Sequence, residues 1–275
     1  MGILNATPDS FSDGGEHLDP ADAADAGAAM VVAGATVLDV GGESTRPGAA
    51  SVDADAQIAR VVPVIDRLRA TAETAETVIS IDTTRAAVAA AAIEAGADLV
   101  NDVSGGTDDP RILEVVADRG VGIVLMHRLR PPATDSYSDR YQQAPEYEDV
   151  VDDVRSRLET LAARAEAAGV AAARIAVDPG LGFGKTVEQN LELILRLDQL
   201  VADGRPVLVG ASRKSFLGAV TGVTTPASRT IESVVSGIEA WRRGAAMLRV
   251  HDVEPHRRGL EIAAGVGMGV GWRPD

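Results

Sequence analysis

The chain has 275 residues, of which 41 are acidic and 26 basic, giving a formal charge of −15, and it contains no cysteine. The missing cysteine excludes disulfides, thiolate nucleophiles and cysteine-ligated metals, and the acidic balance argues against general nucleic-acid binding, which requires a basic face. The length suits one large α/β domain or two small ones, and no apolar stretch reaches the about 18 residues that a membrane span requires.

The first residues run directly into an apolar, strand-like segment. The sequence Met1-Gly-Ile-Leu-Asn5 has no basic region of the kind that opens a signal peptide. We therefore expect a cytoplasmic enzyme that binds neither nucleic acid nor membrane.

Eight short apolar runs alternate with helix-like stretches along the chain. They are continuously apolar rather than alternating, which is typical of parallel strands buried on both faces of a sheet. Eight strand–helix units predict a (β/α)8 barrel, a TIM barrel, formed by a single domain of residues 1–275, and a doubly wound open sheet is the alternative. The expected strands are Gly2–Asn5, Thr36–Val40, Val78–Asp82, Leu99–Val103, Gly122–Met126, Ile175–Asp178, Val207–Val209 and Ala246–Val250.

Two of the intervening stretches show helical spacing clearly. Glu146–Gly169 repeats apolar residues at intervals of three and four, and its final glycine suits a helix end. Thr225–Gly244 gathers its apolar residues on one side. These positions are Val150, Val151, Val154, Leu158, Leu161 and Ala165 in the first stretch, and Ile231, Val234, Val235 and Ile238 in the second.

Polar side chains follow nearly every expected strand. In a barrel, the carboxyl-terminal ends of the strands surround one axial pocket where catalytic groups gather, whereas in an open sheet they spread along an edge. This pattern favours the barrel and predicts one shared polar site. The residues concerned are Asn5, Asp39, Asp82, Asn101, Asp102, His127, Asp178, Ser212, Arg249 and His251.

Two polar loops follow the first two expected strands. Residues 5–15 contain a proline and a glycine pair, and such a loop over a barrel mouth more often contacts a ligand than serves only as a turn. Residues 39–48 combine glycines, which permit close backbone approach, with the donors Ser44, Thr45 and Arg46. That set suits an oxyanion or a carboxylate.

Other strand-end residues suit a flat, nitrogen-rich ring and an anion. Asp82 and Asn101 can accept from ring N–H groups and donate to ring nitrogens, and satisfied core hydrogen bonds are the alternative interpretation. Arg249 and His251 end the last strand, where barrels often place a phosphate site.

Lysine occurs only twice, at Lys185 and Lys214, against 24 arginines. Both follow an apolar run in a turn flanked by glycine or serine. Arginine and lysine are not interchangeable where one donor must fit a confined pocket. We expect Lys214 to join Asp178 in the ring-binding site, and we expect Lys185→Arg to be mild.

These motifs resemble the dihydropteroate synthase family over almost the whole chain. Five ordered motifs of this length make the match highly specific. They are Met1-Gly-Ile-Leu-Asn-Ala-Thr-Pro-Asp-Ser-Phe-Ser-Asp-Gly-Gly15, Asp39-Val-Gly-Gly-Glu-Ser-Thr-Arg-Pro-Gly48, Asp178-Pro-Gly-Leu-Gly-Phe-Gly-Lys185, Ser212-Arg-Lys-Ser215 and Arg249-Val-His-Asp252.

The resemblance implies a (β/α)8 barrel that joins p-aminobenzoate to 6-hydroxymethyl-7,8-dihydropterin pyrophosphate, giving 7,8-dihydropteroate and pyrophosphate in folate biosynthesis. It also implies use of Mg²⁺, inhibition by sulfonamides and a homodimer. The implied roles are pterin binding by Asp82, Asn101, Asp178 and Lys214, metal and pyrophosphate binding by Asn5, pyrophosphate binding by Arg249, His251 and Arg46, and p-aminobenzoate binding by Phe11, Pro47, Phe183 and Ser215 with Thr45 and Asp9.

Two segments depart from the family pattern. After His127 the chain reads Arg128-Leu-Arg-Pro-Pro132, which alters the loop expected beside the pterin. Arg229 is followed by Thr-Ile-Glu232 rather than by the family's glycine, which alters the helices expected to form the dimer. A methyltetrahydrofolate-binding methyltransferase-type barrel and a catalytically silent paralogue are the alternatives. The first has no need of the p-aminobenzoate loops, and the second would be expected to lose a pocket residue.

Overall fold

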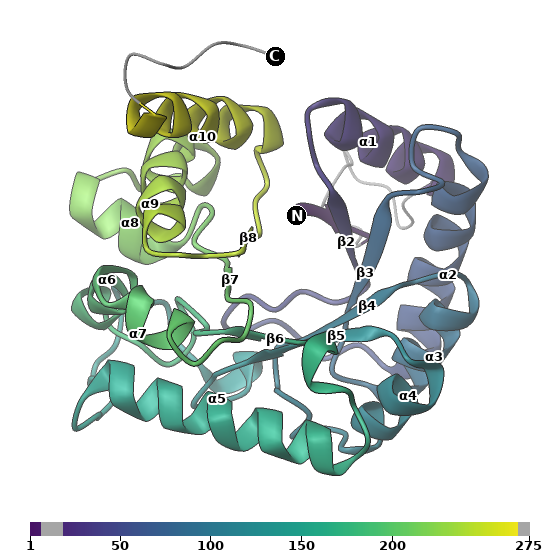
Figure 1. Ribbon diagram of the computed structural model, residues 1–275, viewed down its shortest axis with the longest axis horizontal. Coiled ribbons are helices and arrows are strands. Elements are labelled where there is room, and N and C mark those ends of the chain that lie inside the picture. Colours follow the sequence, from purple (N-terminus) through teal and green to yellow (C-terminus); the bar gives the residue numbers. More distant parts are fainter. Residues whose placement is uncertain (7–18, 269–275) are drawn as a thin grey trace.

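Eight parallel strands stand in chain order around the centre of the molecule, and helices surround them (Figure 1). The computed structural model describes residues 1–6 and 19–268. The strands are β1 (Gly2–Asn5), β2 (Val37–Gly41), β3 (Val78–Asp82), β4 (Leu99–Asp102), β5 (Gly122–Met126), β6 (Ile175–Asp178), β7 (Leu208–Val209) and β8 (Met247–Leu248).

Single bridges at two places close the strands into a ring. β1 to β6 form one six-stranded sheet, and β7 and β8 form a two-stranded sheet. Val177 of β6 bridges Val207, which precedes β7, and Gly2 of β1 bridges Val250, which follows β8. Backbone hydrogen bonds of 2.9 Å accompany the bridges, one at the β6–β7 seam, from Val177 N to Pro206 O, and two at the β8–β1 seam, from Ile3 N to Val250 O and from Val250 N to Met1 O. The prediction of a (β/α)8 barrel is therefore confirmed, and the open-sheet alternative is wrong.

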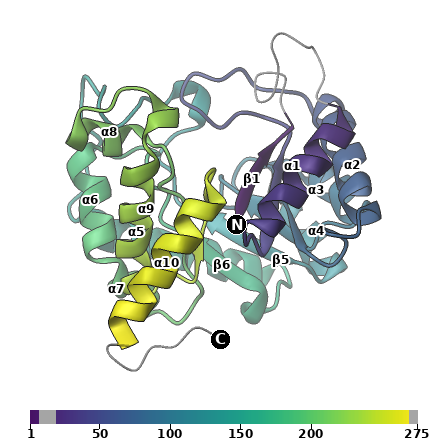
Figure 2. The same ribbon diagram turned by 90° about the horizontal axis from the view of Figure 1, so that it is seen from above.

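The helices form an outer layer around the ring, with α1 to α4 on one side and α6 to α10 on the other (Figures 1 and 2). The α-helices are α1 (Pro20–Val32), α2 (Ala54–Ala70), α3 (Ala86–Glu94), α4 (Arg111–Arg119), α5 (Val150–Ala167), α6 (Val187–Leu195), α7 (Leu197–Val201), α8 (Ser215–Thr221), α9 (Thr230–Arg242) and α10 (Val253–Met268). Short 3-10 turns are η1 (Pro132–Thr134), η2 (Ala172–Arg174) and η3 (Pro226–Ser228).

Capping residues explain where the helices begin and end. The Asp149 carboxylate accepts hydrogen bonds from two backbone amides of the first turn of α5, at 2.9 and 3.0 Å. Thr186 and Gln189 form a capping box at the start of α6. Such contacts satisfy amides that have no partner inside the helix. Gly169 follows α5 with a φ of 101°, a conformation that glycine adopts without steric cost.

The predicted strands agree closely with the observed ones. Four have the expected bounds, β2 is displaced by one residue at both ends, β4 ends one residue early, and β7 and β8 are shorter than expected. Val207 and Val250 supply the seam bridges rather than ladder pairs, which shortens the last two strands. The strongest signal was the continuous apolar run, which both faces of a barrel strand require.

The core between strands and helices is aliphatic. Leu4, Leu38, Ile79, Ile81 and Ile123 are fully buried there. A second cluster gathers side chains from separate strands, and it packs against residues of β4, β6 and β8. Its buried members are Met1, Val37, Val124 and Leu208.

Helix α9 presents small side chains inward and large ones outward. Ser233, Gly237 and Ala240 are buried, whereas Ile231 and Val235 are 76% and 55% exposed. The apolar side expected for Thr225–Gly244 thus faces mostly away from the barrel. Across residues 1–6 and 19–268, no helix is long and apolar enough to cross a membrane.

Candidate active site

The carboxyl ends of β1 to β4 place three predicted groups in one row, with Gly41 between the first two. The strand register pairs Asn5 with Gly41, Gly41 with Asp82, and Asp82 with Asn101. A Cβ atom on Gly41 would lie 3.8 Å from Asn5 Oδ1 and 3.9 Å from Asp82 Oδ2. Both side chains therefore lie beside Gly41 at this end of the sheet.

Arg249 extends from the end of β8 to two carboxylates. Its Nε donates to Asp39 Oδ2 at 2.6 Å and its Nη2 donates to Asp82 Oδ2 at 2.7 Å. Asn101 Nδ2 also donates to Asp39 Oδ2, at 3.3 Å. The arginine expected at a rim phosphate site thus lies among the carboxylates of the ring-binding site, where opposite charges offset the cost of burial.

Two oxygens of this cluster lack a donor. Asp39 Oδ1 and Asp82 Oδ1 are buried, and neither has a hydrogen-bond partner among the described residues. Burial raises the pKa of Asp82, and the Asp39 carboxylate raises it further, while Arg249 opposes the shift. Unpaired buried acceptors are costly, so these oxygens suit a ligand that supplies N–H donors.

Asp178 and Lys214 both lie beside Gly210 at the barrel mouth. A Cβ atom on Gly210 would lie 4.0 Å from both Asp178 Oδ2 and Lys214 Nζ. Burial raises the pKa of Asp178, and the Lys214 ammonium opposes that shift. Burial lowers the pKa of Lys214 to about 8, and Asp178 opposes that shift. Together they offer one acceptor and one donor to a polar ring.

The loop after β6 supplies an apolar wall. Lys214 donates to the carbonyl of Leu181, and its Nζ lies 4.7 Å from the centroid of the Phe183 ring. Phe183 packs with Val103 and Met126 in a small buried cluster. A flat ring bound between Asp82 and Asp178 would find this apolar surface beside it.

His251 and Ser212 form the other side of the mouth. Ser212 Oγ lies 3.0 Å from His251 Nδ1. Burial lowers the pKa of His251 to about 3, and the nearby cations Arg213 and Arg249 lower it further. Arg213, with a φ of 61°, pairs with Asp252 at 2.6 Å. The group is therefore a neutral imidazole beside two ion-paired arginines, which offers hydrogen-bond donors to an anion.

The loop after β2 is braced at its base. Glu43 accepts from Val52 N at 2.8 Å and from Gln57 Nε2 at 2.9 Å. The loop also contacts the segment after β5, because Gly48 N donates to Pro132 O at 2.9 Å. Its predicted ligand residues lie above this base, Arg46 exposed and Thr45 and Pro47 half-buried.

The residues expected to bind p-aminobenzoate are only partly described. Ser215 is the first residue of α8 and follows Lys214 directly, so it lies at the same mouth as the ring-binding groups. Phe183 reaches that mouth from the loop after β6. Asp9 and Phe11 lie outside the described residues.

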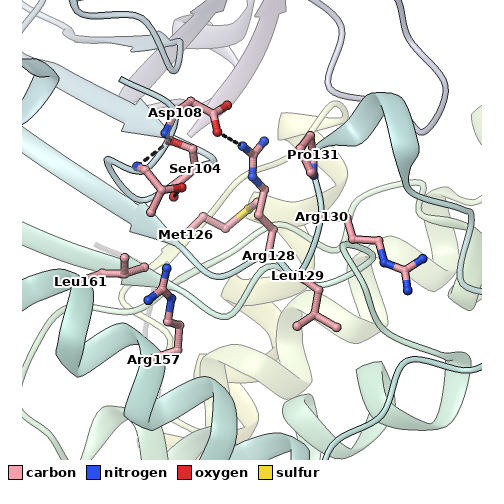
Figure 3. Close-up of a pocket in the computed structure, with 10 residues that line it drawn as sticks. Ser104, Asp108, Met126, Arg128, Leu129, Arg130, Pro131, Arg157 and Leu161 are labelled. Carbon is pink, nitrogen blue, oxygen red and sulfur yellow. Dashed lines mark hydrogen bonds and ion pairs between the residues drawn. The ribbon is translucent and has the colours of Figure 1, made fainter. Parts of the chain in front are cut away.

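The unusual segment 128–132 lines a separate pocket of about 210 Å³ (Figure 3). Arg128 pairs with Asp108 there, and Arg157 of α5 and Met126 complete much of the wall. Figure 3 shows the Arg130 side chain directed away from that ion pair. Met126 is shared between this pocket and the Phe183 cluster. The segment therefore adjoins the ring-binding site at several points, since Leu129 packs against Gly184 of the loop after β6 and Pro132 O accepts from Gly48 N of the loop after β2.

Several residues of the site carry no role in the sequence-based prediction. Asp39 was visible as a strand-end carboxylate, and the strand-end rule alone identifies it. Met126 and Val103 gave no polar signal, since their contribution is an apolar surface. Asp102 accepts from Ser104 N and Gly106 N, both at 2.7 Å, so it shapes its own loop and is not available to a ligand.

Comparison with known proteins identifies the class. Residues 1–251 match the family described as pterin binding enzyme. The dihydropteroate synthase of Mycobacterium leprae is 47% identical over 268 residues, which is 95% of this chain and 91% of that protein.

Two solved structures of the Xanthomonas albilineans dihydropteroate synthase are also similar. One contains 4-aminobenzoic acid, with 41% identity and a TM-score of 0.87, and the other contains 7,8-dihydropteroate, with 38% identity and a TM-score of 0.84. Each match covers 97% of this chain and 92% of the other. The chain therefore belongs to the pterin-binding enzymes and, among them, to the dihydropteroate synthase family.

Proposed function

We propose that this enzyme condenses 6-hydroxymethyl-7,8-dihydropterin pyrophosphate with p-aminobenzoate, giving 7,8-dihydropteroate and pyrophosphate in folate biosynthesis. One structural observation supports this most: buried, unpaired carboxylate oxygens of Asp39 and Asp82 share the barrel mouth with the cations Arg249 and Lys214. The relatives are named dihydropteroate synthases, which favours this reaction over that of a methyltransferase-type barrel.

The pterin ring would lie between the two halves of the mouth. Asp82, Asn101 and Asp178 supply acceptors and an amide, and Lys214 supplies a donor. This pattern matches a ring that carries both N–H groups and acceptor nitrogens. Phe183 and Met126 cover it from the apolar side.

The leaving pyrophosphate requires positive charge. Arg249, Arg46 and the Ser212–His251 pair would bind it, because departure of the anion is easier when donors already surround its oxygens. Arg249 would then exchange part of its contact with Asp82 for the phosphate. The freed Asp82 carboxylate would stabilise the positive charge that develops on the pterin.

The p-aminobenzoate nitrogen then attacks the same carbon. No strong base is required, because the amine loses its proton after the new C–N bond has formed. Phe11, Pro47, Phe183 and Ser215, with Thr45 and Asp9, are the proposed contacts of this substrate. Closure of the first two loops over the ligands would exclude water, which competes with the amine. Sulfonamides, as mimics of p-aminobenzoate, would compete for the same place.

We propose Mg²⁺ as the cofactor, held by Asn5 and by phosphate oxygens of the substrate. Mg²⁺ prefers oxygen ligands and is often bound through substrate phosphates with few protein groups. The donor set fits this mode, because Asn5 Oδ1 lies at the carboxyl end of β1 beside Gly41 and Asp82. The part of the chain that the structure describes contains no cluster of three or more His, Asp or Glu side chains suited to a metal. When bound, the ion would neutralise charge on the leaving group.

A homodimer is proposed through the outer face of α8 to α10. Val220, Ile231, Val235, Ile262 and Val266 are all exposed there. Helix α9 packs against both α8 and α10, so these side chains belong to neighbouring elements. Exposed apolar patches of this kind mark association surfaces.

Buried Arg229 fixes the turn before α9 by donating to backbone carbonyls, including Val223 O at 2.9 Å.

We place the reaction in the cytoplasm. A pyrophosphate ester is too polar to cross a bilayer unaided, so the enzyme belongs in the compartment that makes this substrate.

The assignment is tested by pyrophosphate release from dihydropterin pyrophosphate and Mg²⁺, with and without p-aminobenzoate. Release that rises with p-aminobenzoate and yields dihydropteroate is expected. Pterin binding without release would instead support a methyltransferase-type or silent barrel. Absence of both would overturn the assignment.

A further inference from the structure

Lys185 is among the largest fully buried side chains of the described residues, and the reaction as proposed leaves it without a role. Its Nζ lies 2.9 Å from His127 Nδ1 and donates to the carbonyls of Gly180 at 3.0 Å and Phe183 at 2.9 Å. None of these partners is a carboxylate. A buried ammonium without a counter-ion is costly, so the position calls for a compensating purpose.

The three contacts are satisfied in either protonation state. An ammonium donates to both carbonyls and to the imidazole, whereas a neutral amine donates to both carbonyls and accepts from His127 Nδ1–H. Burial lowers the pKa of Lys185 to about 7, with Asp178 and Asp135 opposing and Lys214 reinforcing that shift. Burial also lowers the pKa of His127, and Lys185 and Arg157 reinforce it. Arginine would stay charged and is larger, so the structure replaces the expectation of a mild Lys185→Arg with a damaging one.

Lys185 and Lys214 lie on opposite sides of one short loop. Lys185 binds the carbonyls of Gly180 and Phe183 from within, while Lys214 contacts the Leu181 carbonyl and the Phe183 ring from the active-site side. A Cβ on Gly182 would lie 3.0 Å from Lys214 Cδ. The loop 180–183 is thus the wall against which Lys214 is packed.

Other contacts hold different parts of this loop. Tyr147 Oη donates to Gly184 O at 2.8 Å, and Gly182 N donates to Asn190 Oδ1 at 2.6 Å. Gly180 has a φ of 68°, and a Cβ there would lie 1.9 Å from His127 O. The loop therefore lies close against the residues after β5, and Lys185 is the group that joins its two ends to His127.

We propose that Lys185 is a positioning residue for the pterin site, which fixes loop 180–183 so that Lys214 is held facing Asp178. The inference rests on the proposed role of Lys214 in pterin binding. It predicts that removing the Lys185 amine changes the surroundings of Lys214 and the pterin affinity, with p-aminobenzoate affinity little affected once pterin is saturating.

The two-lysine composition allows a direct test. Protein labelled with ¹³C at lysine Cε gives two side-chain signals, one from each lysine. In wild type, 6-hydroxymethyl-7,8-dihydropterin pyrophosphate should shift both signals, because the loop couples them. In Lys185→Met the remaining Lys214 signal should move, and pterin affinity should fall by about 10-fold to 100-fold. Thr160→Ala removes one exposed hydrogen bond on α5, to Ser156 O, and serves as the control, with affinity within about twofold.

Two further measurements separate positioning from stability alone. Lys185→Gln keeps two N–H donors for the carbonyls and should retain more pterin affinity than Lys185→Met. A Lys185 signal unmoved by pterin in wild type would overturn the proposal, and so would an unchanged Lys214 signal in a folded variant. Wild type that fails to bind pterin at all would overturn the function instead, and the effect of Lys185→Met on the Lys214 signal would still test the coupling.

Discussion

Arg249 Nη2 donates to Asp82 Oδ2 at 2.7 Å, although the two residues are 167 positions apart in the chain. The contact joins the cation proposed for the leaving group to the carboxylate proposed for the ring. Each is therefore held ready by the other before substrate arrives. The binding of pyrophosphate to Arg249 and the binding of the pterin to Asp82 are therefore coupled, because each ligand replaces one partner of the Arg249–Asp82 ion pair.

Replacing Asp82 by asparagine keeps the shape of the side chain and removes its charge. Arg249 retains Asp39, so the fold should persist. We expect kcat/KM for the pterin substrate to fall about 100-fold, because the developing positive charge loses its carboxylate. Steady-state kinetics measure this, and Asp118→Asn on the exposed side of α4 is the control. Kinetics equal to wild type would remove Asp82 from the mechanism.

Replacing Lys214 by alanine should weaken pterin binding by about 10-fold to 100-fold, the range expected for a lost charged hydrogen bond in a buried site. Lys214→Arg should not restore it, since the larger guanidinium does not fit between Phe183 and Gly182. Equilibrium titration with the pterin substrate measures both variants. An alanine variant with wild-type affinity would show that the assigned role is wrong.

The pH profile of kcat/KM should have two limbs. Raising the pH through about 8 removes the proton of Lys214, whose pKa burial lowers to about 8, so pterin binding weakens on the alkaline side. Lowering the pH protonates Asp82, whose pKa burial raises above its ordinary value, so activity also falls on the acid side. Asp82→Asn should reduce the acid limb, and it should also move the alkaline limb to lower pH, because Asp82 raises the pKa of Lys214. An acid limb unchanged in that variant would assign it to another group.

Stability should depend on pH through Lys185. The unfolded lysine keeps its proton to about pH 10.4, whereas burial lowers the pKa in the folded state to about 7. Unfolding therefore takes up a proton between these values, and the free energy of unfolding rises with pH across that window. Relative to that of Lys185→Met, the free energy of unfolding of wild type should increase by up to about 1.4 kcal/mol for each unit by which the pH is raised. Urea denaturation of both proteins at several pH values measures this difference. Parallel plots of the free energy of unfolding against pH would contradict the lowered pKa of Lys185.

Charge placed on α9 should break the proposed dimer. Ile231→Glu combined with Val235→Glu puts two carboxylates on the exposed apolar face, where burial against a second copy would be unfavourable. Light scattering after size-exclusion chromatography should show a dimer for wild type and a monomer for the variant. Thr160→Glu on the exposed face of α5 is the control. A wild-type monomer at micromolar concentration would contradict the proposal.

The barrel could be predicted because its signals are local. Continuous apolar runs mark strands buried on both faces, and polar residues at their ends mark one mouth. The same rule brought Asp82, Asn101 and Asp178 together correctly. The rule also covers Asp39, but the pairing of Asp39 with Arg249 depends on the fold and has no signal in the sequence.

Other features depend on three-dimensional contacts that no spacing encodes. Arg249 was expected at a rim, yet two carboxylates draw its guanidinium inward. Lys185 was expected to tolerate arginine, but its enclosure by His127 and two carbonyls reverses that expectation. Ile231 and Val235 follow helical periodicity, which shows that a helix has an apolar face but not which neighbour covers it.

The two seams of the ring divide the strands into a larger unit, β1 to β6, and a smaller one. The smaller unit, β7 to β8, carries Lys214, Arg249 and His251, and only one bridge joins it to the larger unit on each side. Amide hydrogen exchange should therefore be fastest, among the strands, at these seams, since local opening there breaks few hydrogen bonds. A substrate that binds cations of the smaller unit and carboxylates of the larger one would hold the two units together. Its binding should therefore slow amide exchange on both sides of each seam.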